Sequence, residues 1–215
     1  MANRKVCIID YGSSNLLSVR RAFEYCGAEV VIADQPSQIM NAEKVVLPGV
    51  GAFKDGMDGL RERGLIDAIR SYAETDKPFL GICLGMQMML DSSEEFGVHQ
   101  GLGLIPGKVV AIPDKNTDGE PHKIPHIGWN EIHSTINGGP WNGTILEGIP
   151  PETSAYFVHS YMAVPANTTH LLAGCKYGNQ EISAVLASGK KYGCQFHPEK
   201  SGEYGLKMIR NFLKI

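Results

Sequence analysis

The residues best suited to chemistry lie in the run Gly81-Ile82-Cys83-Leu84-Gly85. The mostly apolar residues 79–82 predict a short buried strand, and residues 84–90 predict the start of a helix. A nucleophile on such a sharp strand-to-helix turn has a strained backbone, which requires small residues two positions before and after it. The turn also directs the thiol toward the start of a helix, whose N–H groups and dipole favour a thiolate. A buried structural cysteine is the alternative, but the paired glycines favour Cys83 as a nucleophile.

A base for this thiol is available in the run 192–199, Tyr-Gly-Cys-Gln-Phe-His-Pro-Glu. A thiol nucleophile needs a base within hydrogen-bond reach and a group that orients the base. His197 ends a predicted strand, and Glu199 follows two residues later, where its carboxylate can accept the imidazole N–H. Alone, this run is typical of a surface turn. Together with the turn at Cys83 it predicts a Cys83–His197–Glu199 triad, in a different chain order from the nucleophile–acid–histidine order of α/β-hydrolases.

The loop Pro48-Gly-Val-Gly51 is a candidate for half of an oxyanion hole. The N–H of Leu84, directly after the nucleophile, is the first expected donor, and the peptide around Val50 and Gly51 is the second. Glycines on both sides of Val50 allow that peptide two orientations. A phosphate-binding loop is the competing interpretation, which we reject because the third glycine of the dinucleotide fingerprint and the Lys-Ser/Thr pair of the P-loop are both missing.

The elements that must position these residues alternate between strand and helix. Apolar strands are predicted at 5–10, 29–33, 44–47 and 79–82, which implies an α/β fold with a mostly parallel central sheet and helices on both faces. One helix is expected after a cap at Ser13 or Ser14, and a second over residues 55–72. The apolar face of the first helix is expected to hold Leu17, Val19, Ala22, Phe23 and Cys26, with Gly27 ending the helix.

Residues 97–180 are rich in Gly and Pro and predict a smaller, partly antiparallel sheet region. Strands are expected around 108–112, 130–133, 155–159 and 170–176, with exposed loops at 114–120 and 136–143. A hairpin joins 182–187 to 192–196, and a helix over 202–213 closes the chain. Since no linker or repeat is visible, residues 1–215 are expected to form one domain.

Composition excludes several classes of partner. The chain has 215 residues, 43% of them hydrophobic and 20% charged, and a net charge of −3, which favours neither nucleic acid nor an anionic membrane. No apolar run reaches the roughly 18 residues of a membrane span, and no signal-peptide core is seen. Five cysteines without paired spacing indicate a reducing compartment, so we expect a cytoplasmic protein. Four of them are expected to be small core residues: Cys7, Cys26, Cys175 and Cys194.

These motifs resemble those of a known family. Gly-Ile-Cys-Leu-Gly-Met-Gln with a later Gln-Phe-His-Pro-Glu resembles the class I, or triad, glutamine amidotransferases. Four further runs resemble the glutaminase subunits of imidazole glycerol phosphate synthase: Ile-Ile-Asp-Tyr-Gly-x-x-Asn-Leu-x-Ser-Val, Leu-Pro-Gly-Val-Gly-Ala-Phe, Pro-His-Ile-Gly-Trp-Asn and Tyr-Phe-Val-His-Ser-Tyr. The resemblance covers residues 6–212. Ser14 departs from the family's usual glycine, and Met162 from a frequent aromatic residue.

The resemblance implies roles for particular residues. Cys83 attacks the side-chain amide of L-glutamine, His197 transfers the protons, Glu199 orients His197, and a γ-glutamyl thioester is then hydrolysed. The substrate is held by Gln87, Glu95 and the segment His159-Ser160-Tyr161, with Glu94 as an alternative to Glu95. No cofactor is implied.

The resemblance also implies a partner. Ammonia passes to a (β/α)8-barrel cyclase subunit, which forms a heterodimer with the glutaminase and makes imidazole glycerol phosphate and AICAR in histidine biosynthesis. The residues that match the family at the docked mouth are Asn15, Trp129, Asn130, Tyr156 and Lys200. Trp129 could instead be a core residue, the commoner position of tryptophan.

Other hypotheses remain open. A paralogous amidotransferase could feed another synthase, such as one that modifies a sugar; a stand-alone γ-glutamyl hydrolase has similar motifs but is secreted; and a non-enzymatic module of this fold needs no triad. A metal site is not expected, because Pro121 and Pro125 prevent His122 and His126 from sharing a helical face and no cysteine or carboxylate cluster completes a zinc site.

Overall fold

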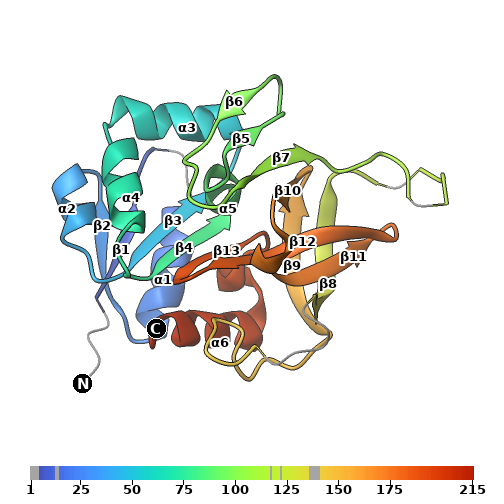
Figure 1. The fold of residues 1–215 in the computed structure, drawn as a ribbon. Helices are drawn as coiled ribbons and strands as arrows, with labels where there is room; N and C mark the ends of the chain where they lie inside the picture. Colours follow the sequence, from blue (N-terminus) through green and yellow to red (C-terminus); the bar gives the residue numbers. More distant parts are fainter. Residues whose placement is uncertain (1–4, 13–14, 117, 122, 136–140) are drawn as a thin grey trace.

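A nine-stranded sheet runs through the computed structural model, which describes residues 5–12, 15–116, 118–121, 123–135 and 141–215. Its order is β2-β1-β3-β4-β13-β12-β11-β8-β9 (Figure 1). The first five strands in that order pair in parallel, and the remaining pairs are antiparallel. The strands are β1 (Lys5–Ile9), β2 (Glu29–Ala33), β3 (Val45–Gly49), β4 (Phe79–Cys83), β8 (His126–Ser134), β9 (Thr153–His159), β11 (Leu171–Tyr177), β12 (Gln180–Ser188) and β13 (Lys191–Cys194).

Helices cover both faces of the parallel half of this sheet (Figure 1). On one face α1 (Leu16–Tyr25) and α6 (Gly202–Phe212) meet through an edge-to-face contact of Phe23 with Phe212, whose ring centroids are 6.2 Å apart. On the other face lie α2 (Pro36–Met40), α3 (Phe53–Glu62), α4 (Ile66–Ala73) and α5 (Leu84–Met88). Because β3, β4 and all of β1 after the exposed Lys5 are buried on both faces, these stretches are continuously apolar.

A second sheet has the order β10-β7-β5-β6 and mixes parallel and antiparallel pairs. The chain passes from the large sheet to this one at Ser160, between the end of β9 and the start of β10. Its strands are β5 (Ser92–Ser93), β6 (His99–Gln100), β7 (Gly107–Ala111) and β10 (Tyr161–Pro165). The predicted α/β fold with a smaller, partly antiparallel sheet is therefore confirmed.

Most predicted elements are present near their expected bounds, including the hairpin of β12 and β13, in which Val185 pairs with Cys194. The expected helix over 55–72 is wrong: α3 ends at Glu62 and α4 begins at Ile66. Gly64, with φ +65°, ends α3 in the left-handed conformation that a glycine adopts readily, and it turns Leu65 into the core. The short helix α2 was not expected; Gln35 and Gln38 form a capping box at its start.

Three smaller expectations about burial and helix ends also need correction. Leu17 is 57% exposed and does not lie on the buried face of α1. The helix after Cys83 ends at Met88, so it is only five residues long. Trp141, in a loop expected to be exposed, is buried, and its indole N–H donates to the Leu172 carbonyl at 3.2 Å. Ser13, Ser14 and residues 136–140 lie outside the described residues.

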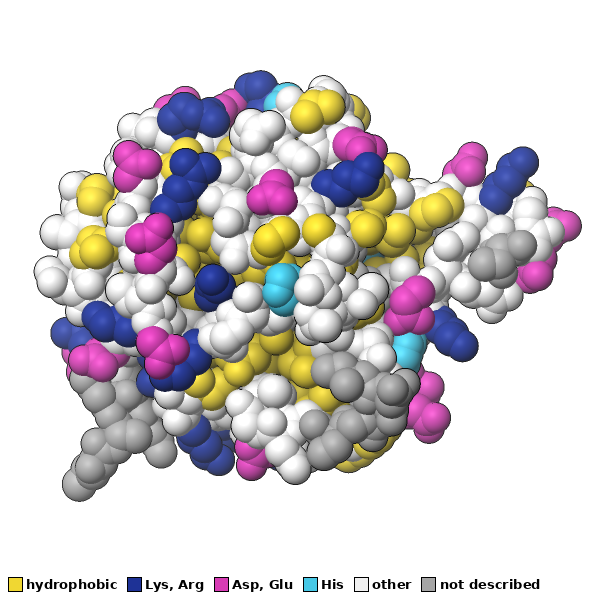
Figure 2. All heavy atoms as spheres, in the orientation of Figure 1, with side chains coloured by type: hydrophobic (Ala, Val, Ile, Leu, Met, Phe, Trp, Pro, Cys, Tyr) yellow, Lys and Arg dark blue, Asp and Glu magenta, His cyan; other side chains and the backbone are white. Residues whose placement is uncertain are grey.

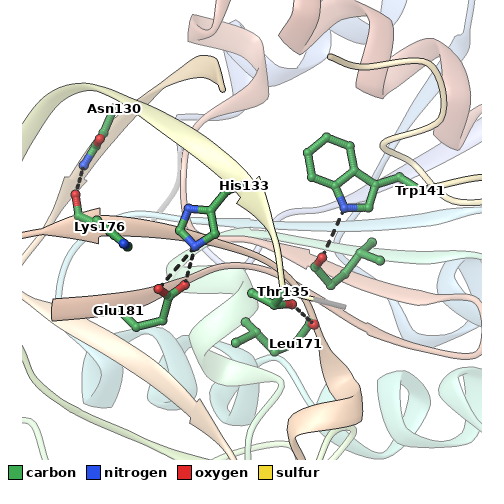
Figure 3. A network of polar contacts seen from close by, with 8 residues as sticks. Asn130, His133, Thr135, Trp141, Leu171, Lys176 and Glu181 are labelled. Carbon is green, nitrogen blue, oxygen red and sulfur yellow. Dashed lines mark hydrogen bonds and ion pairs between the residues drawn. The ribbon is translucent and has the colours of Figure 1, made fainter. Parts of the chain in front are cut away.

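Polar contacts tie β8, which lies between β11 and the edge strand β9, to the adjoining part of the sheet (Figure 3). The His133 imidazole pairs with the Glu181 carboxylate on β12 at 2.9 Å, and Thr135 donates its hydroxyl to the Leu171 carbonyl.

On the face of the molecule shown in Figure 2, acidic and basic side chains are interspersed. In the described part of the chain, no helix has the length and apolar character needed to cross a bilayer.

Candidate active site

Cys83 lies where β4 meets α5, with φ +54° and ψ −113°. A positive φ is strained for a residue with a side chain. Gly81 and Gly85, on either side of Cys83, allow this turn because neighbouring atoms lie where a side chain at either position would be. A Cβ on Gly85 would lie 1.8 Å from the Leu47 carbonyl oxygen, and one on Gly81 would lie 2.6 Å from the Met89 sulfur. The turn is therefore pressed directly against β3 and α5, which explains why both positions hold glycine.

His197 and Glu199 lie together beside this turn. The His197 Nδ1 and the Glu199 Oε1 are 2.8 Å apart, and both side chains are almost fully buried. The Cys83 thiol is the second group that acts on the protonation of the His197 imidazole. Burial alone disfavours the imidazolium, but the hydrogen bonds to Cys83 and Glu199 outweigh it and raise the pKa of His197 above its ordinary value.

Backbone and hydroxyl contacts hold the His-Pro-Glu turn in place. The His197 N–H donates to the Tyr156 carbonyl at 3.0 Å, and the Ser201 hydroxyl donates to the His197 carbonyl at 2.7 Å. The same Ser201 oxygen accepts the Tyr156 N–H, so β9 and the start of α6 share one anchor. Residues Pro198–Lys200 form a single 3₁₀ turn, which places Glu199 behind the imidazole ring.

A cavity of about 390 Å³ opens at Cys83. Most of the candidate residues chosen from the sequence line it, although they come from five separate parts of the chain. Glu199, Asn15, Trp129, Asn130 and Tyr156 do not line it. Its walls are Val50, Gly51, Cys83, Leu84, Gln87, Glu95, Pro125, Val158, His159, Ser160, Tyr161, His197 and Lys200.

The cavity wall distinguishes Glu95 from Glu94. Glu95 lines the cavity, and its Oε2 accepts the Phe53 N–H at 2.6 Å, which caps α3. Glu94 pairs with Lys108 at 2.8 Å on the surface of the small sheet, where both side chains are about half exposed. Glu95 is therefore the carboxylate placed to meet a ligand, and it also holds the loop that follows β3.

Gln87 offers the cavity an acceptor. Its amide nitrogen donates to the Tyr161 carbonyl and to the Gln195 Oε1, each at 3.0 Å. Both N–H groups are thus used inside the protein, and only the amide oxygen of Gln87 remains for a ligand.

Gly49, the last residue of β3, and Gly51, in the loop that follows, are glycines for different structural reasons. Gly51 has φ +96°, which glycine alone adopts readily. A Cβ on Gly49 would lie 2.6 Å from the Tyr11 hydroxyl and 2.9 Å from the Gly85 nitrogen, so close packing excludes a larger residue. The Tyr11 hydroxyl is buried and has no hydrogen-bond partner among the described residues.

The residues expected at a docking surface lie in two different environments. Trp129 on β8 is 59% exposed and packs edge-on against Tyr156, with ring centroids 6.0 Å apart, so it is not a core residue. Ile127, two positions earlier on the same strand, is 53% exposed and was not expected from the sequence. Asn130 instead turns toward β11, where its amide donates to the Lys176 carbonyl at 2.8 Å (Figure 3).

Sequence reasoning missed two buried polar residues beside the cavity. The Gln195 amide nitrogen lies 3.8 Å from the Cys83 sulfur, and the His126 Nδ1 lies 2.9 Å from the His159 Nε2. Gln195 stands within the run that contains His197, but nothing in that run indicates which way its side chain points. Among the described residues, no group of three or more His, Cys, Asp or Glu is placed to hold a metal ion.

Residues 7–215 match the family model described as glutamine amidotransferase class-I. The chain belongs to this family. It is a close homologue of HisH, since it is 58% identical over 210 residues to imidazole glycerol phosphate synthase subunit HisH 1 of Legionella pneumophila (strain Lens), covering 98% of this chain and 99% of that protein. It is 46% identical over 208 residues to subunit HisH of Geobacillus sp. (strain WCH70), covering 97% and 95%.

Solved structures share the fold at low sequence identity. A crystal structure of a glutamine amidotransferase has a TM-score of 0.72 at 16% identity, over 98% of this chain and 99% of that one. The structure of PurLQS from Thermotoga maritima has a TM-score of 0.72 at 20% identity, over 99% and 98%. These likenesses show the fold alone.

Proposed function

We propose that this chain is the glutaminase subunit of imidazole glycerol phosphate synthase and hydrolyses L-glutamine to glutamate and ammonia. The observation that carries the proposal is the buried Cys83–His197–Glu199 arrangement, in which Cys83 and His197 line a cavity, in a close homologue of HisH. All 215 residues act as one amidotransferase domain.

The reaction begins at the Cys83 sulfur. The thiolate attacks the side-chain carbonyl carbon of glutamine, and the negative charge that forms on the oxygen is received by the N–H groups of Leu84 and of the Val50–Gly51 segment. His197 then gives its proton to the amide nitrogen, the C–N bond breaks, and ammonia leaves. Water, deprotonated by His197, hydrolyses the γ-glutamyl thioester and releases glutamate.

The cavity supplies groups for the rest of the substrate. The Gln87 oxygen accepts an N–H of the substrate, and the Glu95 carboxylate pairs with its ammonium group. The backbone of His159, Ser160 and Tyr161 borders the same cavity and holds the α-carboxylate and α-amino groups. Lys200, exposed at the cavity wall, belongs to the mouth of the site.

Ammonia is consumed by a partner, because free ammonia would be protonated in water. We propose a (β/α)8-barrel cyclase, docked as a heterodimer over Asn15, Trp129, Asn130, Tyr156 and Lys200. The exposed Ile127 and Trp129 on β8 support this surface.

The test uses the complex with the cyclase. Cys83→Ala is expected to abolish glutamine-dependent synthesis of imidazole glycerol phosphate, while ammonium salts still support it. Cys26→Ala, which removes another buried thiol in α1's packing, serves as the matched control and is expected to retain both activities. Glutamine hydrolysis that persists in Cys83→Ala would exclude Cys83 as the nucleophile, and loss of both activities would show that it is structural.

A further inference from the structure

Gln195 lies directly behind the nucleophile. It follows β13, is fully buried, and does not line the cavity. Its amide nitrogen is 3.8 Å from the Cys83 sulfur. A polar side chain buried this completely needs its hydrogen bonds satisfied inside the protein. The orientation of its amide group can therefore be worked out from the donors and acceptors that surround it.

The neighbours of Gln195 determine which end of its amide faces the sulfur. The Tyr161 carbonyl can only accept, so the Gln87 nitrogen must face it. The second N–H of Gln87 then points at Gln195 and requires an oxygen there. A reversed Gln195 amide would set two NH₂ groups against each other, and therefore the Gln195 nitrogen is the end that faces Cys83.

His159 stabilises the Tyr161 carbonyl, at which this series of hydrogen bonds begins. The His159 Nδ1 lies 2.8 Å from the same Tyr161 carbonyl and therefore donates to it. Burial lowers the pKa of His159 to about 4, although the Tyr161 carbonyl opposes the shift, so the ring stays neutral near pH 7 and its Nε2 is an acceptor. His126 is then the donor in the 2.9 Å contact between the two rings.

We infer that Gln195 is a further catalytic residue, whose amide N–H donates to the Cys83 sulfur and stabilises its thiolate, and that Gln87, Tyr161 and His159 position that amide. The inference rests on the proposed function, because it assumes that the Cys83 thiolate is the reacting group. A hydrogen bond to an ionised sulfur in a buried, low-dielectric site is stronger than one in water. Gln87 therefore has two roles: its oxygen faces the substrate, and its nitrogen orients Gln195.

The test measures the rate of alkylation of Cys83 by iodoacetamide as a function of pH, with the labelled cysteine identified by mass spectrometry. Gln195→Met removes the donor with little change in volume, and Gln195→Glu keeps the oxygen that Gln87 needs while replacing the donor by an acceptor. We expect Gln195→Met to slow alkylation near pH 7 by about tenfold and to move the midpoint of the pH profile upward by about one unit. Gln195→Glu is expected to do both to a larger extent.

The matched control is Asn211→Asp in α6. Asn211 is also a buried amide with two hydrogen bonds, to the Ile145 and Glu147 carbonyls, but it lies away from the cavity. Asn211→Asp is expected to lower the midpoint of thermal unfolding without moving the pH profile of Cys83 alkylation. The comparison separates a general loss of stability from the loss of the donor at Gln195.

The outcomes distinguish this inference from the proposed function. If Cys83 in the unaltered chain is not alkylated faster than the other four cysteines, the nucleophile assignment fails. If Cys83 reacts fast and the profile is unchanged in folded Gln195→Met, Gln195 does not act on the thiolate, and the inference alone is overturned.

Discussion

At the scale of single residues, the proposed chemistry depends on how burial and hydrogen bonds compete at His197. Its environment is nearly dry, which disfavours a charged ring, yet the contacts with Cys83 and Glu199 raise its pKa. Glu199 touches neither the cavity nor the sulfur in the described contacts, so in the proposed reaction it would act through the imidazole. A positioning carboxylate of this kind affects the protonation of the ring more than the binding of substrate.

Glu199→Gln is predicted to move the alkaline limb of the glutaminase pH profile to lower pH. The reason is that removing the carboxylate charge lowers the pKa of His197, so the proton needed by the leaving ammonia is lost at a lower pH. Turnover should fall by a smaller factor than in His197→Ala, with little change in the KM for glutamine. The measurement is kcat as a function of pH, in complex with the cyclase; a variant as inactive as Cys83→Ala would show that Glu199 does more than orient the ring.

At the scale of elements, the junction of β4 with α5 controls the position of the sulfur. The helix α5 has only five residues, so its dipole is small. The backbone geometry of Cys83 is set by the packing of this junction against β3. Gly85 allows the first turn of α5 to approach the Leu47 carbonyl.

Gly85→Ala is predicted to lower the free energy of unfolding by about 3 kcal/mol, since the added methyl group would overlap a backbone oxygen that cannot easily move. Gly64→Ala between α3 and α4 is the control: its Cβ meets nothing within 4 Å, so only the strain of a positive φ remains, about 1 kcal/mol. Urea unfolding of both variants provides the comparison. Equal losses would mean that close packing at the junction is unimportant.

At the scale of the whole molecule, the cavity and the exposed strand β8 are connected through β9. Tyr156 on β9 contacts Trp129 on one side, and its carbonyl accepts the His197 N–H. A partner that covered Trp129 would therefore lie one strand away from His197.

Trp129→Ala is predicted to raise the Kd of the complex with the cyclase by about 30-fold or more, because exposed tryptophans at the centre of an interface are common hot spots. Its exposure means that thermal stability should change little. Tyr25→Ala, which removes a 70% exposed aromatic residue at the far end of α1 from Asn15, is the control and should leave the Kd unchanged. Binding can be measured by titration calorimetry; equal effects of the two substitutions would place the interface elsewhere.

The isolated chain is predicted to hydrolyse glutamine slowly. In the isolated chain, the Gly49-Val50-Gly51 segment is expected to point a carbonyl, and not an N–H, at the oxyanion position, and the missing donor costs on the order of 10²–10³ in rate. Docking and a ligand bound by the cyclase would shift the peptide. Glutaminase activity should therefore rise mainly when the cyclase and its nucleotide substrate are both present. Full activity of the chain alone would instead favour a stand-alone hydrolase.

The sequence by itself determined the features that depend on local backbone chemistry. Gly81, Cys83 and Gly85 specify the turn because the positive φ of Cys83 and the approach of Gly81 to Gly85 and Met89 involve residues close together in the chain. Alternating apolar strands and helices specified the layers for the same reason. Gly64 was also a local signal for the end of a helix. The apolar pattern on both sides of it nevertheless led to the prediction of one continuous helix.

Only the tertiary structure decided which distant side chains meet. Cys83 and Gln195 are 112 positions apart, and their contact depends on the register of β4 with β13, in which Gly81 pairs with Gly193 and Ile82 with Cys194. A shift of one residue would turn Gln195 to the other face of the sheet. The tertiary structure also decided that Glu95, and not Glu94, lines the cavity and that Trp129 is exposed. Burial and hydrogen-bond partners are properties of the packed chain and not of any short run of residues.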